Sequence, residues 1–352
     1  METILVTGGA GFLGGWFVRR WLADRPGRIV VLDKLTYAGS VASLASVHRE
    51  ERLFFHRGDI GDGPFVARLL VQYRPRAIVN FAAESHVDRS IDAPAPFVSA
   101  NVVGTCQLLD ESLSYWHRLP DAQRRSFRFL HVSTDEVYGS IFEPGRAEES
   151  DRYRPSSPYA ASKAAADHFV RAYHRTYGLP VLVVHPSNCY GPLQFPEKLV
   201  PLMTLNAIDG NPLPIYGDGR QRRDWLFGED LCRAVCDVLD HGQLGEAFNV
   251  ATGVETPNGD LVRRICRLVD QLVPNLPHAP STTLIRNVED RPGHDERYAL
   301  DTAKIERLGW RPRVMLDDGL EQTVRWYVEN RAWVDQVAAS FDRTKRMGVV
   351  AS

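Results

Sequence analysis

A glycine-rich turn directly after the first apolar run constrains the fold of this chain more than any other feature. Residues 4–20 read ILVTGGAGFLGGWFVRR, which predicts a strand, a turn and the start of a helix. Gly9, Gly11 and Gly14 fit the pattern G-x-G-x-x-G, and Gly8, Gly11 and Gly14 fit its G-x-x-G-x-x-G variant. Because glycines let a pyrophosphate approach the amides of a helix N-terminus, the stretch predicts a dinucleotide-binding turn.

The following residues alternate short apolar runs with longer helical patterns. The apolar runs are TILVT, RIVVLD, LFFHRGD, AIVNFAA, FRFLHVS and PVLVVHP. Such alternation predicts right-handed crossovers and an α/β fold, a Rossmann-like doubly wound parallel sheet with helices on both faces. Ligands of such a sheet gather at the carboxyl ends of its strands. We therefore expect residues 1–186 to form a dinucleotide-binding domain that also holds the catalytic residues.

Beyond Pro186 the pattern changes to many prolines and short strands, with helices near 230–240, 257–272 and 317–330. Strands are predicted at PLPIYG, RDWLF and AFNVAT. This predicts that residues 187–340 form mainly a smaller, mixed α/β C-terminal substrate-binding lobe, with some segments returning to the larger domain. Residues 341–352 are expected to be a frayed tail.

The composition favours a small-molecule substrate. Lys and Arg number 42 against 44 Asp and Glu, and the net charge of −2 gives no reason to expect nucleic acid or an acidic membrane as partner. The five cysteines lack CxxC spacing, and only Cys232 and Cys236 lie four apart, so we expect reduced thiols and no metal. The opening METILVTGG passes from Met into a strand, and no apolar run reaches about 18 residues, which predicts a cytoplasmic protein without a membrane span.

Asp33 ends the second apolar run, 19 residues after Gly14. A carboxylate there accepts both ribose hydroxyls and repels a 2′-phosphate, which favours NAD over NADP. Lys34 is placed to contact a phosphate, and Asp59, after the third run, is placed to meet the adenine. The alternative is a structural glycine turn beside a surface aspartate. The strand before the turn and the helix after it argue against that alternative.

The stretch SPYAASKAAADHF carries Tyr159 and Lys163 one turn apart, on one face of a helix predicted over 159–177. A nearby ammonium, together with a positive nicotinamide ring, is expected to lower the pKa of the phenol from ~10 toward neutrality. Tyr159 would then take a hydroxyl proton while hydride leaves for NAD. Such a pair also occurs on ordinary exposed helices, but here it accompanies a dinucleotide turn.

Asp135 and Glu136 lie side by side in HVSTDEVYGS, directly after the fifth apolar run. Repulsion between adjacent carboxyls is expected to raise one pKa and to leave the other group ionised, which suits an acid and a base in one site. The alternative is a solvated turn. Their position at the carboxyl end of a strand, with Tyr159 and Lys163 nearby, favours the site.

Through TGGAGFLG and YAASK the chain resembles the extended short-chain dehydrogenase/reductase family. Within it the chain is similar to the dTDP-glucose 4,6-dehydratases, on stretches that run nearly from end to end. The most specific of these stretches are ESHVDRSI, STDEVYG and DRPGHD.

The resemblance implies a three-step reaction on a nucleotide sugar with no net redox change. Tyr159 and NAD oxidise the hydroxyl at carbon 4, and the ketone acidifies the hydrogen on carbon 5. Water is then eliminated across carbons 5 and 6, with Glu136 as base and Asp135 as acid, and hydride returns to carbon 6. Thr134 would hydrogen-bond the hydroxyl at carbon 4. The product is a 4-keto-6-deoxy sugar.

The resemblance also implies the binding residues. NAD is assigned to Gly8, Gly11, Phe12, Leu13, Gly14, Asp33, Lys34, Asp59, Ile60, Ala82, Tyr159 and Lys163. The nucleotide sugar is assigned to Ser85, His86, Asn188, Glu197, Lys198, Leu199, Arg223, Asn258, Arg291, His294 and Tyr298. Arg223 matches the diphosphate-binding arginine, with Arg222 as an adjacent candidate, and a planar guanidinium suits bidentate phosphate binding.

The chain departs from the family pattern at Ser40, His185 and Cys189, where Asn, Arg and Asn are usual. These changes leave the nucleotide and the sugar open, but not the reaction type. The family also implies a homodimer through helices near 97–113 and 159–177.

Two other functions have to be weighed. A nucleotide-sugar 4-epimerase or a glucuronate decarboxylase of the same family needs no proton donor at carbon 6, so Asp135 argues against both. A non-catalytic NAD-binding scaffold would not need the set of Tyr159, Lys163, Asp135 and Glu136.

Overall fold

A seven-stranded parallel sheet forms the centre of the larger domain. The computed structural model describes residues 2–339 and 341–343, so most of the predicted tail at 341–352 lies outside the described residues. All neighbouring strands pair in parallel, which confirms the predicted Rossmann-like fold. In spatial order the strands are β10 (Ala247–Val250), β6 (Val181–Pro186), β5 (Arg128–Val132), β4 (Ala77–Asn80), β1 (Thr3–Thr7), β2 (Arg28–Asp33) and β3 (Leu53–Arg57).

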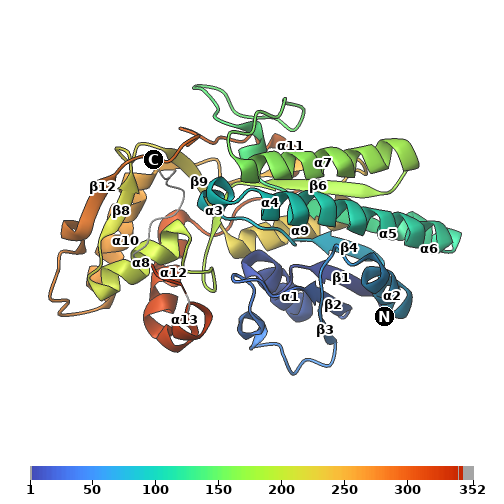
Figure 1. Ribbon diagram of the computed structural model, residues 1–352, viewed down its shortest axis with the longest axis horizontal. Coiled ribbons are helices and arrows are strands. Elements are labelled where there is room, and N and C mark those ends of the chain that lie inside the picture. Colours follow the sequence, from blue (N-terminus) through green and yellow to red (C-terminus); the bar gives the residue numbers. More distant parts are fainter. Residues whose placement is uncertain (1, 340, 344–352) are drawn as a thin grey trace.

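Helices cover both faces of this sheet (Figure 1). Helices α1 (Phe12–Asp24) and α9 (Gly228–His241) pack together on one face, where Phe17 and Trp21 lie in the apolar core. The other face carries α2 (Gly63–Tyr73), α5 (Gly104–Arg118) and α7 (Pro158–Tyr177). Because both faces are covered, the central strands β1 and β4 are buried along their whole length.

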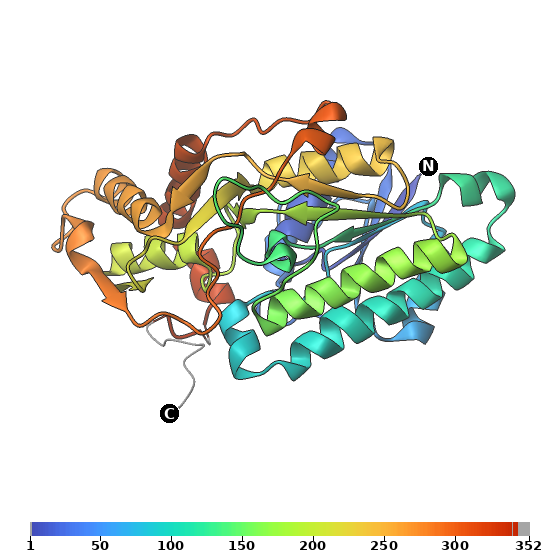
Figure 2. The same ribbon diagram turned by 90° about the horizontal axis from the view of Figure 1, so that it is seen from above.

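Helix α7 is the longest helix of the described chain and matches the helix predicted over 159–177. Ser157 caps its start by accepting a hydrogen bond from the backbone amide of Ala160, and Gly178 ends it in the left-handed conformation. In Figure 2 α7 runs beside α5 along the larger domain.

The smaller lobe packs at the carboxyl edge of the large sheet (Figures 1 and 2). It contains a three-stranded sheet, β11–β9–β7, and a two-stranded sheet, β12–β8. Its core lies between these sheets and three helices, with Tyr190 and Phe227 fully buried. The elements are β7 (Asn188–Tyr190), α8 (Leu199–Asp209), β8 (Leu213–Tyr216), β9 (Arg222–Phe227), β11 (Glu255–Pro257), α10 (Asn258–Leu272), β12 (Ile285–Val288), α12 (Leu316–Glu329) and α13 (Arg331–Val337).

Strand β10 does not belong to the smaller lobe, where the sequence had placed AFNVAT. It pairs with β6 and extends the large sheet, and α11 (Ala303–Arg307) contacts it. All four of its residues are buried, so it needs cover on both faces, which the large sheet provides. The remaining short helices are η1 (Val41–Leu44), α3 (Val87–Asp92), α4 (Ala95–Phe97), η2 (Val98–Val103), α6 (Asp121–Ser126), η3 (Asp135–Tyr138) and η4 (Ser281–Leu284).

No helix within residues 2–339 and 341–343 has the length and apolar character that a membrane crossing requires.

Asp224 on β9 connects the lobe to the large sheet. Its carboxylate accepts hydrogen bonds from the backbone amides of Thr252 and Gly253, just after β10, at 2.9 and 2.6 Å. The hydroxyl of Ser187, between β6 and β7, lies 3.2 Å from it. Burial raises the pKa of Asp224, although these donors oppose the rise. The carboxylate therefore ties three segments together at the edge where the site lies.

We expect Asp224→Ala to lower the free energy of unfolding by about 1–3 kcal/mol, because two partly buried backbone amides lose their acceptor. The exposed Asp218→Ala serves as the control and should change it by less than about 0.5 kcal/mol. Urea unfolding followed by circular dichroism measures both. Equal stability of the two variants would contradict the role given to Asp224.

Candidate active site

The glycine turn brings backbone, without side chains, to the start of α1. Gly8 has a φ of +69°, and a Cβ there would lie 2.6 Å from the backbone nitrogen of Ala82. A Cβ on Gly14 would lie 2.2 Å from the carbonyl oxygen of Gly8. Gly11 is the N-cap residue, and no side chain caps the helix. The first-turn amides are thus left without a side-chain acceptor at a cavity wall, which fits a pyrophosphate.

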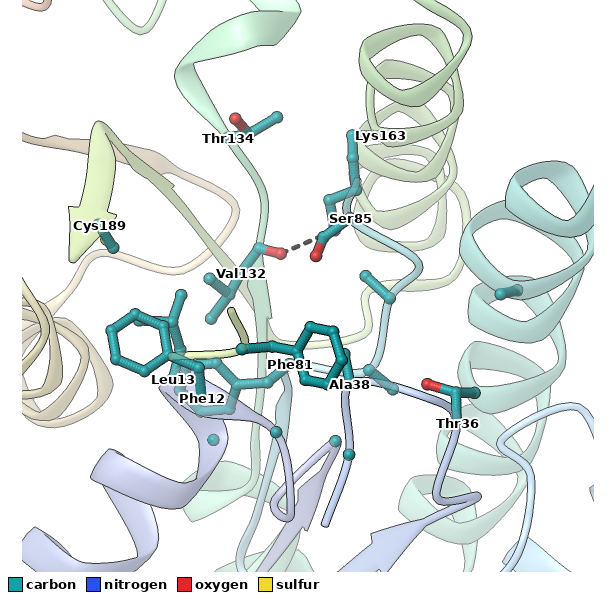
Figure 3. A pocket seen from close by; sticks show the side chains of 18 of the residues that line it. Phe12, Leu13, Thr36, Ala38, Phe81, Ser85, Val132, Thr134, Lys163 and Cys189 are labelled. Atoms are coloured by element: carbon teal, nitrogen blue, oxygen red, sulfur yellow. Dashed lines mark hydrogen bonds between the residues drawn. The ribbon is translucent and has the colours of Figure 1, made fainter. Parts of the chain in front are cut away.

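One cavity brings together all of the residues that the sequence assigned to NAD. Figure 3 shows Phe12 and Leu13 on one side of it, and Thr134 and Lys163 on the other. Asp33 is buried at its wall and accepts hydrogen bonds from the amides of Ala10 and Leu35 at 2.9 and 2.8 Å. These two bonds fix the carboxylate after β2, where it fits a ribose.

Lys34 lies near two acids at the mouth of this cavity. Its ammonium is 3.7 Å from Asp59 and 3.8 Å from Glu84, and its side chain is partly exposed. Contacts of Lys34 with a phosphate and of Asp59 with the adenine stay predictions.

Tyr159 and Lys163 both line the cavity from the first turns of α7. The expected lowering of the Tyr159 pKa is wrong for the protein chain alone. Burial raises the pKa of the phenol, the charge of Glu136 raises it further, and a hydrogen bond with Thr134 opposes the rise. The sequence pattern carries no information on burial, which is the largest cause of this rise.

Asp135 and Glu136 begin the short helix η3 directly after β5, with Thr134 as its N-cap. Burial first, and the charge of Glu136 second, raise the pKa of Asp135 well above its usual range. Burial also raises the pKa of Glu136, but the charges of Arg291, Arg223 and Lys198 oppose that rise. Burial is therefore a larger cause than the predicted repulsion. The pair is nevertheless unequal, since only Glu136 has three cations acting on it.

One carboxylate oxygen of Asp135 is free to hydrogen-bond a ligand. Thr134 donates to its Oδ1 at 3.2 Å, while the buried Oδ2 has no hydrogen-bond partner in the described chain. Because buried polar atoms normally have partners, Oδ2 marks a place where a substrate hydroxyl would complete the site.

Four of the predicted substrate residues line the same cavity: Ser85, Asn188, Glu197 and Lys198. The Lys198 ammonium donates to the carbonyl of Ser85 at 2.6 Å. The Glu197 carboxylate is already bonded within the chain, by the Tyr37 hydroxyl at 2.8 Å and by Arg89 at 3.1 Å. Glu197 therefore joins the loop after β2 to α3, in addition to any contact with substrate.

The other seven predicted substrate residues lie outside this cavity. Arg223 donates to the carbonyls of Asp295 and Glu296 at 2.7 and 3.2 Å, and its guanidinium lies over the ring of Tyr298. Arg291 pairs with Asp88 at 2.8 Å. The remaining members are His86, the N-cap of α3, Leu199 at the start of α8, Asn258 at the start of α10, and His294, which bonds Asp290.

The sequence did not identify several residues of the cavity wall. Among them are Thr36, Phe81, Ser133, Gln194 and Phe195. The first three lie just after β2, β4 and β5, so their place at a carboxyl end of a strand was the available signal. Among the described residues no group of three or more His, Cys, Asp or Glu side chains is placed to hold a metal.

The sequence matches the family model of GDP-mannose 4,6 dehydratase over residues 5–323. A dTDP-glucose 4,6-dehydratase of Xanthomonas campestris is 52% identical to it over 349 residues, which cover 99% of both chains. This chain belongs to the dTDP-glucose 4,6-dehydratase family. The predicted resemblance is confirmed.

Solved structures agree with membership of the dTDP-glucose 4,6-dehydratase family. The dTDP-glucose 4,6-dehydratase of Streptomyces venezuelae, with NAD and TYD bound, has a TM-score of 0.87 and 46% identity, covering 96% of this chain and 100% of that one. The UDP-glucose 4-epimerase of Thermus thermophilus, in complex with NAD, is more distant, with a TM-score of 0.81 and 29% identity over 94% and 100% of the two chains.

We expect Gly14→Ala to weaken NAD binding by about tenfold or more. The new Cβ would lie 2.2 Å from the carbonyl oxygen of Gly8, so the turn has to move away from its binding geometry. Gly15→Ala is the matched control. Its Cβ would lie 3.3 Å from the movable end of Arg19, and its other neighbours, Gly9 and Leu44, would be at ordinary contact distances of 3.6 and 3.9 Å. Isothermal titration of both variants with NAD measures the effect. Equal affinities would contradict the assigned turn.

Proposed function

We propose that this protein is an NAD-dependent dTDP-glucose 4,6-dehydratase, which converts dTDP-glucose to the 4-keto-6-deoxy sugar. The observation that carries the proposal is one cavity that holds three features together. These are the side-chain-free turn of α1, the pair of Tyr159 and Lys163, and the acid pair of Asp135 and Glu136.

Tyr159 acts as the base for the hydroxyl at carbon 4, and Thr134 orients that hydroxyl. NAD held at the glycine turn of α1 would supply the hydride acceptor for carbon 4 and the hydride donor for carbon 6. The chain by itself raises the pKa of Tyr159, so ionisation of the phenol depends on positive charge brought to the cavity beside Lys163. The site is therefore poised to react only when its cofactor position is filled.

The two acids divide the elimination between them. Glu136, with three cations acting on it, takes the proton from carbon 5, which the ketone at carbon 4 has made acidic. Asp135, whose pKa is raised much further, keeps its proton and gives it to the leaving hydroxyl of carbon 6. Glu136 then returns its proton to carbon 5 as the hydride reaches carbon 6.

The smaller lobe supplies most of the groups for the nucleotide sugar. Arg223, Arg291 and Lys198 place positive charge at the acid pair, on the side from which a diphosphate would enter. Residues 1–186, joined by β10 and α9, act as the NAD-binding domain, and 187–340 act mainly as the substrate lobe. A cytoplasmic location accords with the five free cysteines.

An epimerase remains the second candidate, since an NAD-bound UDP-glucose 4-epimerase shares the fold. Incubation with NAD and a panel of nucleotide sugars in heavy water separates the two. A 4-keto-6-deoxy product with solvent deuterium at carbon 5 supports the dehydratase. An epimer, a pentose or unchanged sugar would contradict it, and the preferred nucleotide sugar would resolve the substitutions at Ser40, His185 and Cys189.

Asp135→Asn should leave oxidation at carbon 4 intact but slow elimination by about 100-fold or more, since Asn cannot donate the acid proton. Stopped-flow absorbance of reduced nicotinamide should then show it accumulating, and mass spectrometry should show little product. Glu136→Gln, the companion variant, also blocks elimination and in addition stops exchange of the carbon 5 hydrogen with solvent. Equal loss of oxidation and elimination in Asp135→Asn would overturn its role.

A homodimer through α5 and α7 is the proposed assembly. Apolar side chains are exposed along these helices and the adjoining η2, where Val98, Val103 and Phe169 are 51, 59 and 43% exposed. Such exposure is typical of a surface that a partner covers.

Phe169→Glu should convert the dimer to a monomer of 39.6 kDa in sedimentation experiments, because the interface would bury an unpaired charge. Phe142→Glu is the control, as Phe142 is 79% exposed on the loop before α7 and should leave the mass unchanged. A monomeric unsubstituted protein would rule out this assembly.

A further inference from the structure

A buried carboxylate that the reaction does not use lies beneath the cavity. Asp167 follows Lys163 by one turn on α7 and is fully buried. Its Oδ2 accepts hydrogen bonds from the hydroxyls of Ser133 and Tyr153 at 2.7 and 3.0 Å, and His185 Nε2 lies 3.1 Å away. Burial alone would raise the pKa of Asp167. The hydrogen bond and charge of His185, together with the charges of His131 and Lys163, oppose this rise, and the pKa is lowered. The carboxylate is therefore negative.

His131 on β5 lies between this carboxylate and the catalytic lysine. Its Nε2 is 3.2 Å from Lys163 Nζ and 3.5 Å from Asp167 Oδ1, and Asn80 contacts its Nδ1 at 3.0 Å. Burial and the charge of Lys163 lower the pKa of His131 to about 3. The imidazole is thus neutral near pH 7, and it does not compete with Lys163 for the positive charge.

Lys163 needs a negative neighbour to stay charged. Its Nζ donates to the carbonyl of Val132 at 2.8 Å (Figure 3), but a carbonyl carries no net charge. Burial lowers the pKa of Lys163 to about 8, and Asp167 is the group that opposes this lowering. An ammonium that loses its counter-charge in such a place becomes a neutral amine at lower pH.

We propose that Asp167 is a positioning residue for oxidation at carbon 4: its buried charge keeps the Lys163 ammonium charged beside Tyr159. The proposal rests on the proposed function only in giving Lys163 its role in that step. The titratable groups that face this pair are His131 on β5, Tyr138 on η3, Tyr153 before α7 and His185 on β6.

The direct test is a titration of Lys163 itself. The chain contains only five lysines, so carbon-labelled lysine gives a resolvable NMR spectrum: Lys34, Lys163, Lys198, Lys304 and Lys345. In the full-length protein with NAD added, Asp167→Asn should lower the Lys163 pKa by about one pH unit or more. Tyr153→Phe, the matched control, removes a hydrogen bond to the same oxygen without removing charge and should leave that pKa nearly unchanged.

An unchanged Lys163 titration in Asp167→Asn would overturn the proposal. Should that variant not fold, Asp167→Glu keeps the negative charge one methylene away and should leave Lys163 charged at pH 7. Loss of the Lys163 charge in spite of the retained carboxylate would contradict the proposal. Both Lys163 titrations are measured without turnover of a nucleotide sugar. Absence of reaction with every nucleotide sugar in the unsubstituted protein would instead count against the proposed function.

The pH profile gives the kinetic counterpart. Oxidation requires the charged lysine, so its rate falls as pH rises through the Lys163 pKa of about 8. Single-turnover measurements of nicotinamide reduction give this rate at each pH. In Asp167→Asn the pH at which the rate falls should be lower than in the unsubstituted protein, and in Tyr153→Phe that pH should be unchanged. A uniform loss of rate at every pH would indicate a merely structural role and contradict the proposal.

Discussion

The active site depends on charge that is held away from water. Lys163, Asp135 and Asp167 are 2, 3 and 0% exposed, a degree of burial that strongly disfavours an unpaired charge. Each of these three groups avoids an unpaired buried charge in a different way. Asp135 takes up a proton, Asp167 stays charged among donors, and Lys163 stays charged beside Asp167. An acid, an anion and a cation thus lie at or just beneath one cavity.

The parallel sheet makes this arrangement possible. Thr7, Asn80 and His131 occupy matching positions on β1, β4 and β5, and their side chains form a buried polar row that ends at Lys163. The turns after the same strands carry the glycines, Ala82 and the acid pair. Because all strands end at one edge, the polar row and the reactive groups meet there without a long connection.

Local patterns predicted much of the fold and of the site. The glycine turn, the Tyr159 and Lys163 pair and the acids after β5 are each fixed by residues close in sequence, so spacing alone identified them. Contacts between distant segments were not predictable in this way. Tyr37 and Glu197 meet across 160 residues, and β10 joins a sheet whose other strands lie far before it. The Tyr159 pKa was misjudged for a related reason, since burial is produced by the whole fold.

The most direct test of the dehydratase mechanism follows the hydrogen of carbon 4. dTDP-glucose with deuterium at carbon 4 should give a 4-keto-6-deoxy product with that deuterium on carbon 6, because hydride leaves one carbon and returns to the other within a single site. A mixture with unlabelled substrate should show no exchange of label between molecules. Deuterium found again at carbon 4, or lost to the added NAD, would contradict the account.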